Sequence, residues 1–181
     1  MIKRYVSMKN IYVPFLFLVS IFLFSSCSQK QKKVLIFSKT AEYRHNSIEK
    51  GVQSVKELLE SNNILVDVSE DAVYFTEDSL KQYAAIIFLN TTGDILNSHQ
   101  QTDFERYIQA GGGFVGIHSA TDTEYHWPWY NQLVGAYFNG HPAIQDANLR
   151  CLNKEEACCQ NLPDTWTLNE EWYNFKSINP K

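Results

Sequence analysis

The stretch GGGFVGIHSATDTEYHW (residues 111–127) decides the fold, because a short apolar run ends on a histidine and polar residues follow at once. Its residues 114–117 lack the alternation of apolar and polar side chains seen in a half-exposed strand, so they predict a strand buried on both faces. Gly116 and Ala120 stand two positions before and two positions after His118. Small residues at these positions are typical of a nucleophile elbow, a sharp turn from a strand into a helix. The stretch therefore predicts an elbow with His118 at its apex.

Short apolar runs elsewhere predict three more buried strands, at residues 34–37, 64–68 and 84–89. Helices are expected between the strands. One has Asn46 as its N-cap, with Glu49 three residues later. Another begins with a capping box of Ser98 and Gln101 and stops at the glycines of residues 111–113. This alternation predicts an α/β fold, a parallel sheet with helices on both faces and right-handed crossovers.

The first 26 residues are expected to be a lipoprotein-type signal peptide. A basic start and the apolar run 11–24 lead to small residues before Cys27, and the run is too short for a flanked membrane span. This end resembles the lipobox of bacterial lipoproteins, in which the cysteine is acylated. Plain secretion and an uncleaved anchor are the alternatives. We expect residues 27–33 to be a tether, residues 34–181 to be the domain, and the protein to be lipid-anchored in the bacterial cell envelope, facing the periplasm.

Charge and cysteine content limit the partners of this chain. The net charge of −4, with mixed signs and no basic stripe after Lys33, argues against a nucleic-acid partner. Three cysteines follow Cys27, at Cys151, Cys158 and Cys159. Their spacing favours a local disulfide from Cys151 to one of the other two, on a surface hairpin, over a metal cluster.

The expected site is formed by the loops at the carboxyl ends of the strands, where open parallel sheets bind their ligands. His118 is interpreted as a general base or a metal ligand, or else as a residue that only satisfies backbone groups beneath its loop. Asp122 and Glu124 follow it in the same loop. Arg44 and His45 precede the first helix, whose positive end favours an anion or a sugar hydroxyl. Arg44 alternatively covers an acidic neighbour.

Aromatic residues crowd the chain after this loop. Such rings stack on carbohydrate, but they also pack a loop onto its own domain, and both interpretations stay open for Tyr125, Trp127, Trp129 and Tyr130. His99, on an exposed helical turn, is expected to be solvated surface. Further imidazole and carboxylate groups, which spacing alone does not place at the site, are His141 and Glu170 or Glu171.

Four segments resemble the ThuA-like (trehalose utilisation) family, whose fold is similar to class I glutamine amidotransferases. They are VLIFSKTAEYRHNSI, AIIFLNTTGD, FERYIQAGGGFVGIHSATDTEYHWPWYNQLVGAYFNGHP and NEEWYNF. The resemblance implies a flavodoxin-like sheet and a role in the catabolism of disaccharides or glycosides, including oxidised 3-keto sugars. The amidotransferases carry a cysteine at the elbow apex, so His118 excludes their cysteine-dependent glutaminase chemistry. The family motifs, carried over position by position, imply a polar set at the ligand edge: His45, His118, Asp122, His141 and Glu171.

The resulting hypothesis is a hydrolase or related enzyme that acts on trehalose or a related glycoside. Its catalytic residues would be His118, His45 and Asp122, and its substrate-binding residues Arg44, Glu124, His141 and Glu171. A divalent metal such as zinc fits these residue types, although no HxH or HExxH spacing supports it. The alternatives are a lipid-anchored, non-catalytic carbohydrate-binding protein and a nonfunctional fragment. The last is considered because family members continue past EWYNF whereas this chain stops at SINPK, so the sheet is expected to be incomplete at the C-terminus.

Overall fold

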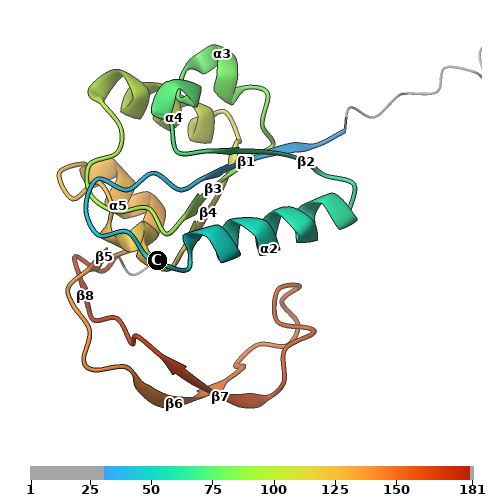
Figure 1. Cartoon of the computed structure of the whole chain (residues 1–181), viewed down its shortest axis with the longest axis vertical. Coiled ribbons are helices and arrows are strands. Elements are labelled where there is room, and N and C mark those ends of the chain that lie inside the picture. Colours follow the sequence, from blue (N-terminus) through green and yellow to red (C-terminus); the bar gives the residue numbers. More distant parts are fainter. Residues whose placement is uncertain (1–30, 180–181) are drawn as a thin grey trace, which may run out of the picture. The chain divides into compact units, whose positions relative to one another are not determined.

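A four-stranded parallel sheet forms the centre of the protein in the computed structural model, which describes residues 31–179. The strand order is β2-β1-β3-β4, with bounds β1 Lys33–Phe37, β2 Leu65–Ser69, β3 Ala85–Leu89 and β4 Gly113–Ile117 (Figure 1). The predicted α/β fold is confirmed, and each predicted strand lies within one residue of its observed position at either end. The prediction that all four strands are buried is wrong for β2 and β4, which are the edge strands of this sheet and leave Val68 and Val115 exposed. All pairings in this sheet are parallel, so the four carboxyl ends lie at one edge.

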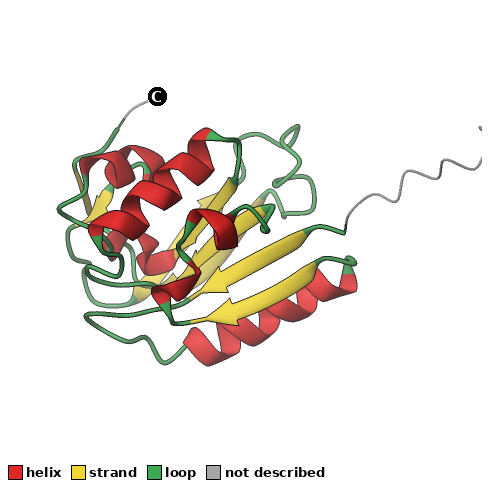
Figure 2. Cartoon of the chain, turned by 90° about the horizontal axis from the view of Figure 1, so that it is seen from above, coloured by secondary structure: helices red, strands yellow, loops and turns green. Residues whose placement is uncertain are grey.

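Helices cover both faces of the sheet, as Figure 2 shows. Helix α2 (Ile48–Ser61) packs on one face through Ile48 and its half-buried neighbours. The other face carries α3 (Glu77–Leu80), α4 (Ser98–Gln109) and α5 (Pro128–Val134). Two short 3-10 helices, η1 (Ala72–Tyr74) and η2 (His118–Asp122), lie in the connections.

Both expected helix caps are displaced by one residue. The N-cap of α2 is Ser47 rather than Asn46, and its side chain makes no capping bond; its hydroxyl accepts a hydrogen bond from the Asn90 amide. In α4 the capping box is formed by Asn97 and Gln100 instead of Ser98 and Gln101. The Asn97 side chain accepts from two backbone amides, and an asparagine at this position caps a helix at least as well as a serine.

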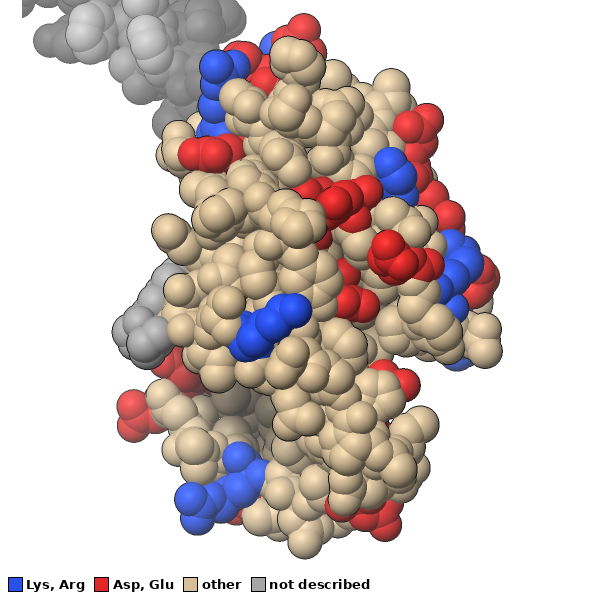
Figure 3. Space-filling model, turned by 90° about the vertical axis from the view of Figure 1, so that its left-hand side faces the viewer, with Lys and Arg blue, Asp and Glu red and all other residues tan. Residues whose placement is uncertain are grey.

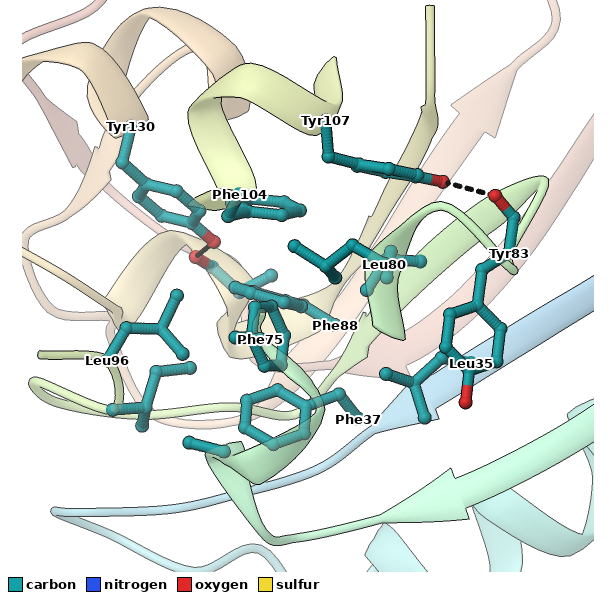
Figure 4. Packing of buried hydrophobic residues seen from close by; sticks show 14 of the residues in the cluster. Leu35, Phe37, Phe75, Leu80, Tyr83, Phe88, Leu96, Phe104, Tyr107 and Tyr130 are labelled. Carbon is teal, nitrogen blue, oxygen red and sulfur yellow. Dashed lines mark hydrogen bonds between the residues drawn. The ribbon is translucent and has the colours of Figure 1, made fainter. Parts of the chain in front are cut away.

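An aromatic core fills the space between the sheet and helices α3 to α5 (Figure 4). Phe37, Phe75, Phe88 and Phe104 are fully buried, and their ring centroids lie 4.6–5.8 Å apart in successive pairs. Burial of one such side chain contributes about 1.5–3 kcal/mol. The core thus fixes the sheet whose edge carries the loops described below.

Two antiparallel strand pairs follow the sheet. One joins β5 (Tyr137–Phe138) to β8 (Phe175–Lys176), and the other is the hairpin of β6 (Gln145–Arg150) and β7 (Thr165–Glu170). The three cysteines of the described chain lie in the β6–β7 connection, and all are free. The expected disulfide is therefore absent from this part of the structure. Cys158 and Cys159 are in contact, but their sulfurs are 3.7 Å apart, well beyond the ~2.05 Å of a disulfide bond.

The signal peptide, Cys27 and most of the tether lie outside the described residues. Within residues 31–179 no helix has the length and apolar character needed to cross a membrane. On the face shown in Figure 3, acidic and basic side chains of the described residues are interspersed with uncharged ones, without a continuous basic stripe.

Candidate functional site

His118 stands at the sharp turn from β4 into η2. Its φ angle is 53°, in the left-handed region that non-glycine residues seldom adopt. The backbone closes so tightly here that a Cβ atom on Gly116 would lie 3.0 Å from the Cβ of Ala120. The structure thus has the elbow that these two small residues predict, and the turn projects the imidazole from the carboxyl edge of the sheet.

The loops at this edge run side by side beyond the strands. Thr40, after β1, forms a parallel bridge with Thr92, after β3, and Gly93 forms another with Thr123, after β4. Through these bridges the β1 loop reaches across the β3 loop toward the elbow. This arrangement brings His45 to His118 although their strands are not neighbours in the sheet.

Three side chains from distant parts of the chain converge at the elbow. The Nε2 atoms of His45 and His118 are 3.1 Å apart, and the His118 Nε2 is 3.4 Å from the Glu171 Oε2. Each of the three residues offers one ligand atom, and these atoms all lie within 4.8 Å of one another. Among the described residues this is the one group of histidine, cysteine and carboxylate side chains with metal-binding geometry. We call it the His45–His118–Glu171 cluster.

Polar and aromatic groups surround the cluster. The Tyr173 hydroxyl lies 2.9 Å from the His118 Nε2, and the Ser119 Oγ lies 3.5 Å from the His45 Nδ1. His141 approaches from the side, with its Nε2 3.9 Å from the Glu171 Oε1. The exposed ring of Tyr43 contacts the His45 ring edge to face, with 4.8 Å between centroids. The site is therefore partly buried, with the exposed Tyr43 ring beside it.

Burial sets the protonation of His45. Desolvation lowers its pKa, and the neighbouring His118 lowers it further, against the opposite influence of Glu171 and Asp122. The neutral imidazole is thus the favoured form of His45, as a proton acceptor or metal ligand requires. Asp122 stands close enough to act on this charge, while its carboxylate accepts a hydrogen bond from the Tyr125 hydroxyl.

The family model for ThuA, described as trehalose utilisation, matches residues 33–181. The chain belongs to the ThuA family. The resemblance read from its motifs is thereby confirmed, and the match spans the sheet, the elbow and the segment that carries Glu171.

Two solved structures are similar to the ThuA domain of this chain. A ThuA-like protein from Bacteroides uniformis ATCC 8492 is 26% identical with a TM-score of 0.69; the alignment covers 83% of this chain and 64% of that one. A ThuA-like protein from Parabacteroides merdae ATCC 43184 is 21% identical with a TM-score of 0.64, over 80% and 63% of the two chains, and supports the fold alone. The chain thus spans under two thirds of the length of both. No curated protein matches it.

Two of the predicted substrate-binding residues of the ThuA domain have partners elsewhere in the protein. Arg44 forms ion pairs with Glu49 at 2.7 Å and Glu70 at 2.9 Å. It therefore covers acidic neighbours, which was the alternative to binding a ligand. Glu124 is 1% exposed. Its Oε1 accepts from the backbone amides of Ile95 and Leu96, and its Oε2 accepts from the Gln101 side chain. The structure does not bring Arg44 or Glu124 into the His45–His118–Glu171 cluster.

The aromatic loop packs onto its own domain. Tyr130 is fully buried and donates to the Ala120 carbonyl, while Tyr125, Trp127 and Trp129 pack against the same core. His99 is exposed on α4, as expected. The aromatic rings beside the cluster are instead those of Tyr43 and Tyr173, as described above.

Sequence reasoning missed that Tyr43 and Tyr173 lie beside the cluster, and it did not predict the approach of the Ser119 hydroxyl to His45. A signal was present for Tyr173, because it comes two positions after Glu171, and residues two apart in an extended segment face the same side. A cavity of about 560 Å³ also escaped prediction, but it lies at the opposite edge of the sheet, where Ala84 and Gly112 precede β3 and β4. It is separate from the cluster.

Proposed function

We propose that this ThuA-family protein is a hydrolase or related sugar-modifying enzyme in the catabolism of trehalose or a related glycoside, including 3-keto derivatives. The observation that carries the proposal is the convergence of His45, His118 and Glu171 at the carboxyl edge of the sheet. These residues come from three distant segments, and no packing requirement of the core explains why they meet. Grouped imidazole and carboxylate side chains in a partly open site are suited to proton transfer.

The two histidines have opposite roles in proton transfer: one accepts a proton and the other donates one. His45 accepts a proton from the attacking water or from a substrate hydroxyl, and His118 donates one to the leaving glycosidic oxygen. Glu171 faces the His118 Nε2 at 3.4 Å, where its carboxylate would stabilise positive charge that develops on the ring. Asp122 acts on the charge of His45 from the same loop as the elbow. Bond cleavage thus moves one proton into the site and one out of it.

The surroundings of the cluster favour a sugar as the substrate. Tyr43 is 65% exposed and offers an aromatic face, and sugar rings stack on such faces through their C–H groups. The Tyr173 hydroxyl and the His141 ring supply hydrogen-bonding groups at the same site. A ligand with a ring and several hydroxyl groups satisfies both kinds of contact.

Location forms part of the proposal. We place the protein in the bacterial cell envelope, anchored by acylation of Cys27 and facing the periplasm, where it would meet imported sugars. Labelling with a fatty-acid analogue tests this directly: the wild-type chain should incorporate the label and the Cys27→Ser variant should not. Equal labelling of both chains would refute the anchor.

Turnover tests the enzyme. The purified full chain is incubated with trehalose and with its 3-keto derivative, and released monosaccharide is measured. His118→Asn is the informative variant, because asparagine tolerates the left-handed backbone but cannot transfer protons. We expect kcat to fall about 10²–10⁴-fold. His99→Ala, in an exposed histidine, should retain full activity. Saturable sugar binding without turnover in the wild-type chain would overturn the enzyme proposal in favour of a binding protein.

A further inference from the structure

We propose that His45, His118 and Glu171 bind a single divalent transition-metal ion, zinc being the best fit, through two imidazole Nε2 atoms and one carboxylate oxygen. The inference deepens the proposed function and rests on the same side chains. An Nε2 atom that coordinates an ion can neither accept nor donate a proton. The ion would therefore replace the direct proton transfer by the two histidines described above, and the two descriptions can be tested separately.

The distances between the three ligand atoms match those around one ion. Zinc lies about 2.0–2.2 Å from nitrogen and oxygen ligands, which places tetrahedral ligands roughly 3.3–3.6 Å from one another. The two Nε2 atoms are 3.1 Å apart, and the His118 Nε2 is 3.4 Å from the Glu171 Oε2. All three atoms lie within 4.8 Å of each other. Small side-chain adjustments are sufficient to complete a common coordination centre.

The hydrogen-bonding capacity of the His118 Nε2 is stronger evidence for a bound ion than the distances between the ligand atoms. Its Nε2 carries either one hydrogen or one lone pair, so it forms one good hydrogen bond. In the structure this atom faces three groups: the His45 Nε2, the Tyr173 hydroxyl and the Glu171 carboxylate. A cation between the rings would use the lone pairs of both imidazoles and the carboxylate charge together. Without it, these groups compete for a single position.

The supporting contacts resemble those of metal sites. Metal-bound histidines usually hydrogen-bond through their second ring nitrogen, and the His45 Nδ1 lies 3.5 Å from the Ser119 Oγ. The second carboxylate oxygen of Glu171 faces the His141 Nε2 at 3.9 Å. Both rings and the carboxylate are partly exposed, with 25% of the His118 and 22% of the Glu171 side chain accessible. An ion can therefore enter, and a fourth position is left for water or substrate.

The ligand set indicates what the ion would do. Two histidines and one glutamate with an open position are the composition of a class of catalytic zinc sites. A bound divalent ion there lowers the pKa of a coordinated water and polarises a carbonyl or hydroxyl oxygen. Tyr173, at 2.9 Å from the His118 Nε2, is placed to hydrogen-bond such a water or the substrate.

Metal stoichiometry tests the inference. The three described cysteines are themselves soft-metal ligands, so all three are replaced by serine to give a matched background. The full chain in this background is stripped with a chelator, reloaded with zinc, and titrated by calorimetry, with metal content measured by mass spectrometry. We expect one zinc per chain. His45→Ala, His118→Asn and Glu171→Gln should each weaken binding by more than about 100-fold, beyond the loss typical of supporting residues, whereas His99→Ala should bind like its parent.

Cobalt provides a second readout that does not depend on how the variants fold. Cobalt bound to the cysteine-free chain should show the visible absorption of a tetrahedral nitrogen and oxygen site. No zinc or cobalt binding in this background, or unchanged binding in His118→Asn, would overturn the metal site. Sugar turnover by a chain that binds neither zinc nor cobalt would refute the metal while leaving the sugar enzyme standing. One bound zinc with no turnover would support the metal site and refute the enzyme.

Discussion

Replacing Glu124 by alanine is expected to destabilise the ThuA domain by about 2–6 kcal/mol. The Glu124 Oε1 accepts from the Ile95 amide at 2.9 Å and the Leu96 amide at 2.7 Å, and both of these residues are buried. A buried backbone amide left without an acceptor costs about 1–3 kcal/mol, and two are left here. The Gln101 side chain also loses its partner, the Glu124 Oε2 at 2.7 Å. A water that enters the space moves the result toward the lower end of the range.

Urea denaturation followed by circular dichroism measures this loss, and Glu124→Gln is its matched control. Glutamine keeps an acceptor for the two amides, and Gln101 can rotate its own amide to accept from the new NH₂ group. Burial raises the pKa of Glu124, so its replacement by a neutral group also removes a desolvation cost. We expect Glu124→Gln to unfold within about 1 kcal/mol of the wild-type chain. If Glu124→Ala unfolds at the wild-type urea concentration but loses sugar binding, the carboxylate is a substrate ligand and our reasoning is wrong.

Three further outcomes follow from the geometry. A Cβ on Gly112 would lie 2.3–2.5 Å from ring atoms of Tyr107. Gly112→Ala should therefore lower the free energy of unfolding, measured in urea, by about 1–3 kcal/mol. Unchanged stability would show that the Tyr107 ring moves aside freely. Burial and the neighbouring His118 lower the pKa of His45 below 6.5, so as the pH falls the unfolded chain takes up this proton at a higher pH than the folded chain does. The contribution of neutral His45 to folding stability is therefore complete above about pH 6.5 and is lost as the pH falls toward the folded pKa. Melting temperatures between about pH 8 and pH 5 should therefore fall less steeply in His45→Gln, and parallel curves would contradict this. Tyr173→Phe should lower kcat about tenfold at near-normal stability, because it removes the hydroxyl group that contacts the His118 Nε2. A variant with the wild-type kcat would show that this contact does not contribute to catalysis.

The sheet and the elbow were predictable because local pattern determines them. Short apolar runs bounded by polar or turn residues indicate strands, and parallel strands place their following loops at one edge. The pattern did not reveal that β2 and β4 lie at the edges of the sheet, where their side chains are partly exposed. The close approach of Gly116 to Ala120 explains why small residues at these two positions indicate the turn at His118. The meeting of His45 and His118 followed from that shared edge.

The rest of the site depends on non-local contacts that spacing does not reveal. Glu171 reaches the cluster only because the β6–β7 hairpin returns the chain to the elbow. Arg44 and His45 are neighbours in sequence, yet adjacent side chains of an extended segment point to opposite sides, and Arg44 instead pairs with Glu70. Glu124 has a φ of 56°, and this turn goes with a side chain directed to buried amides rather than to the ligand edge.

The central claim is that sugars are handled at the His45–His118–Glu171 cluster, and histidine NMR tests it most directly. The full chain is labelled with ¹⁵N in its histidine rings, whose signals are assigned by single substitutions, and is titrated with trehalose and its 3-keto derivative. We predict that the ring signals of His45 and His118 shift together with saturating ligand, while those of exposed His99 stay fixed. Saturable sugar binding that leaves both His45 and His118 unshifted would contradict the account.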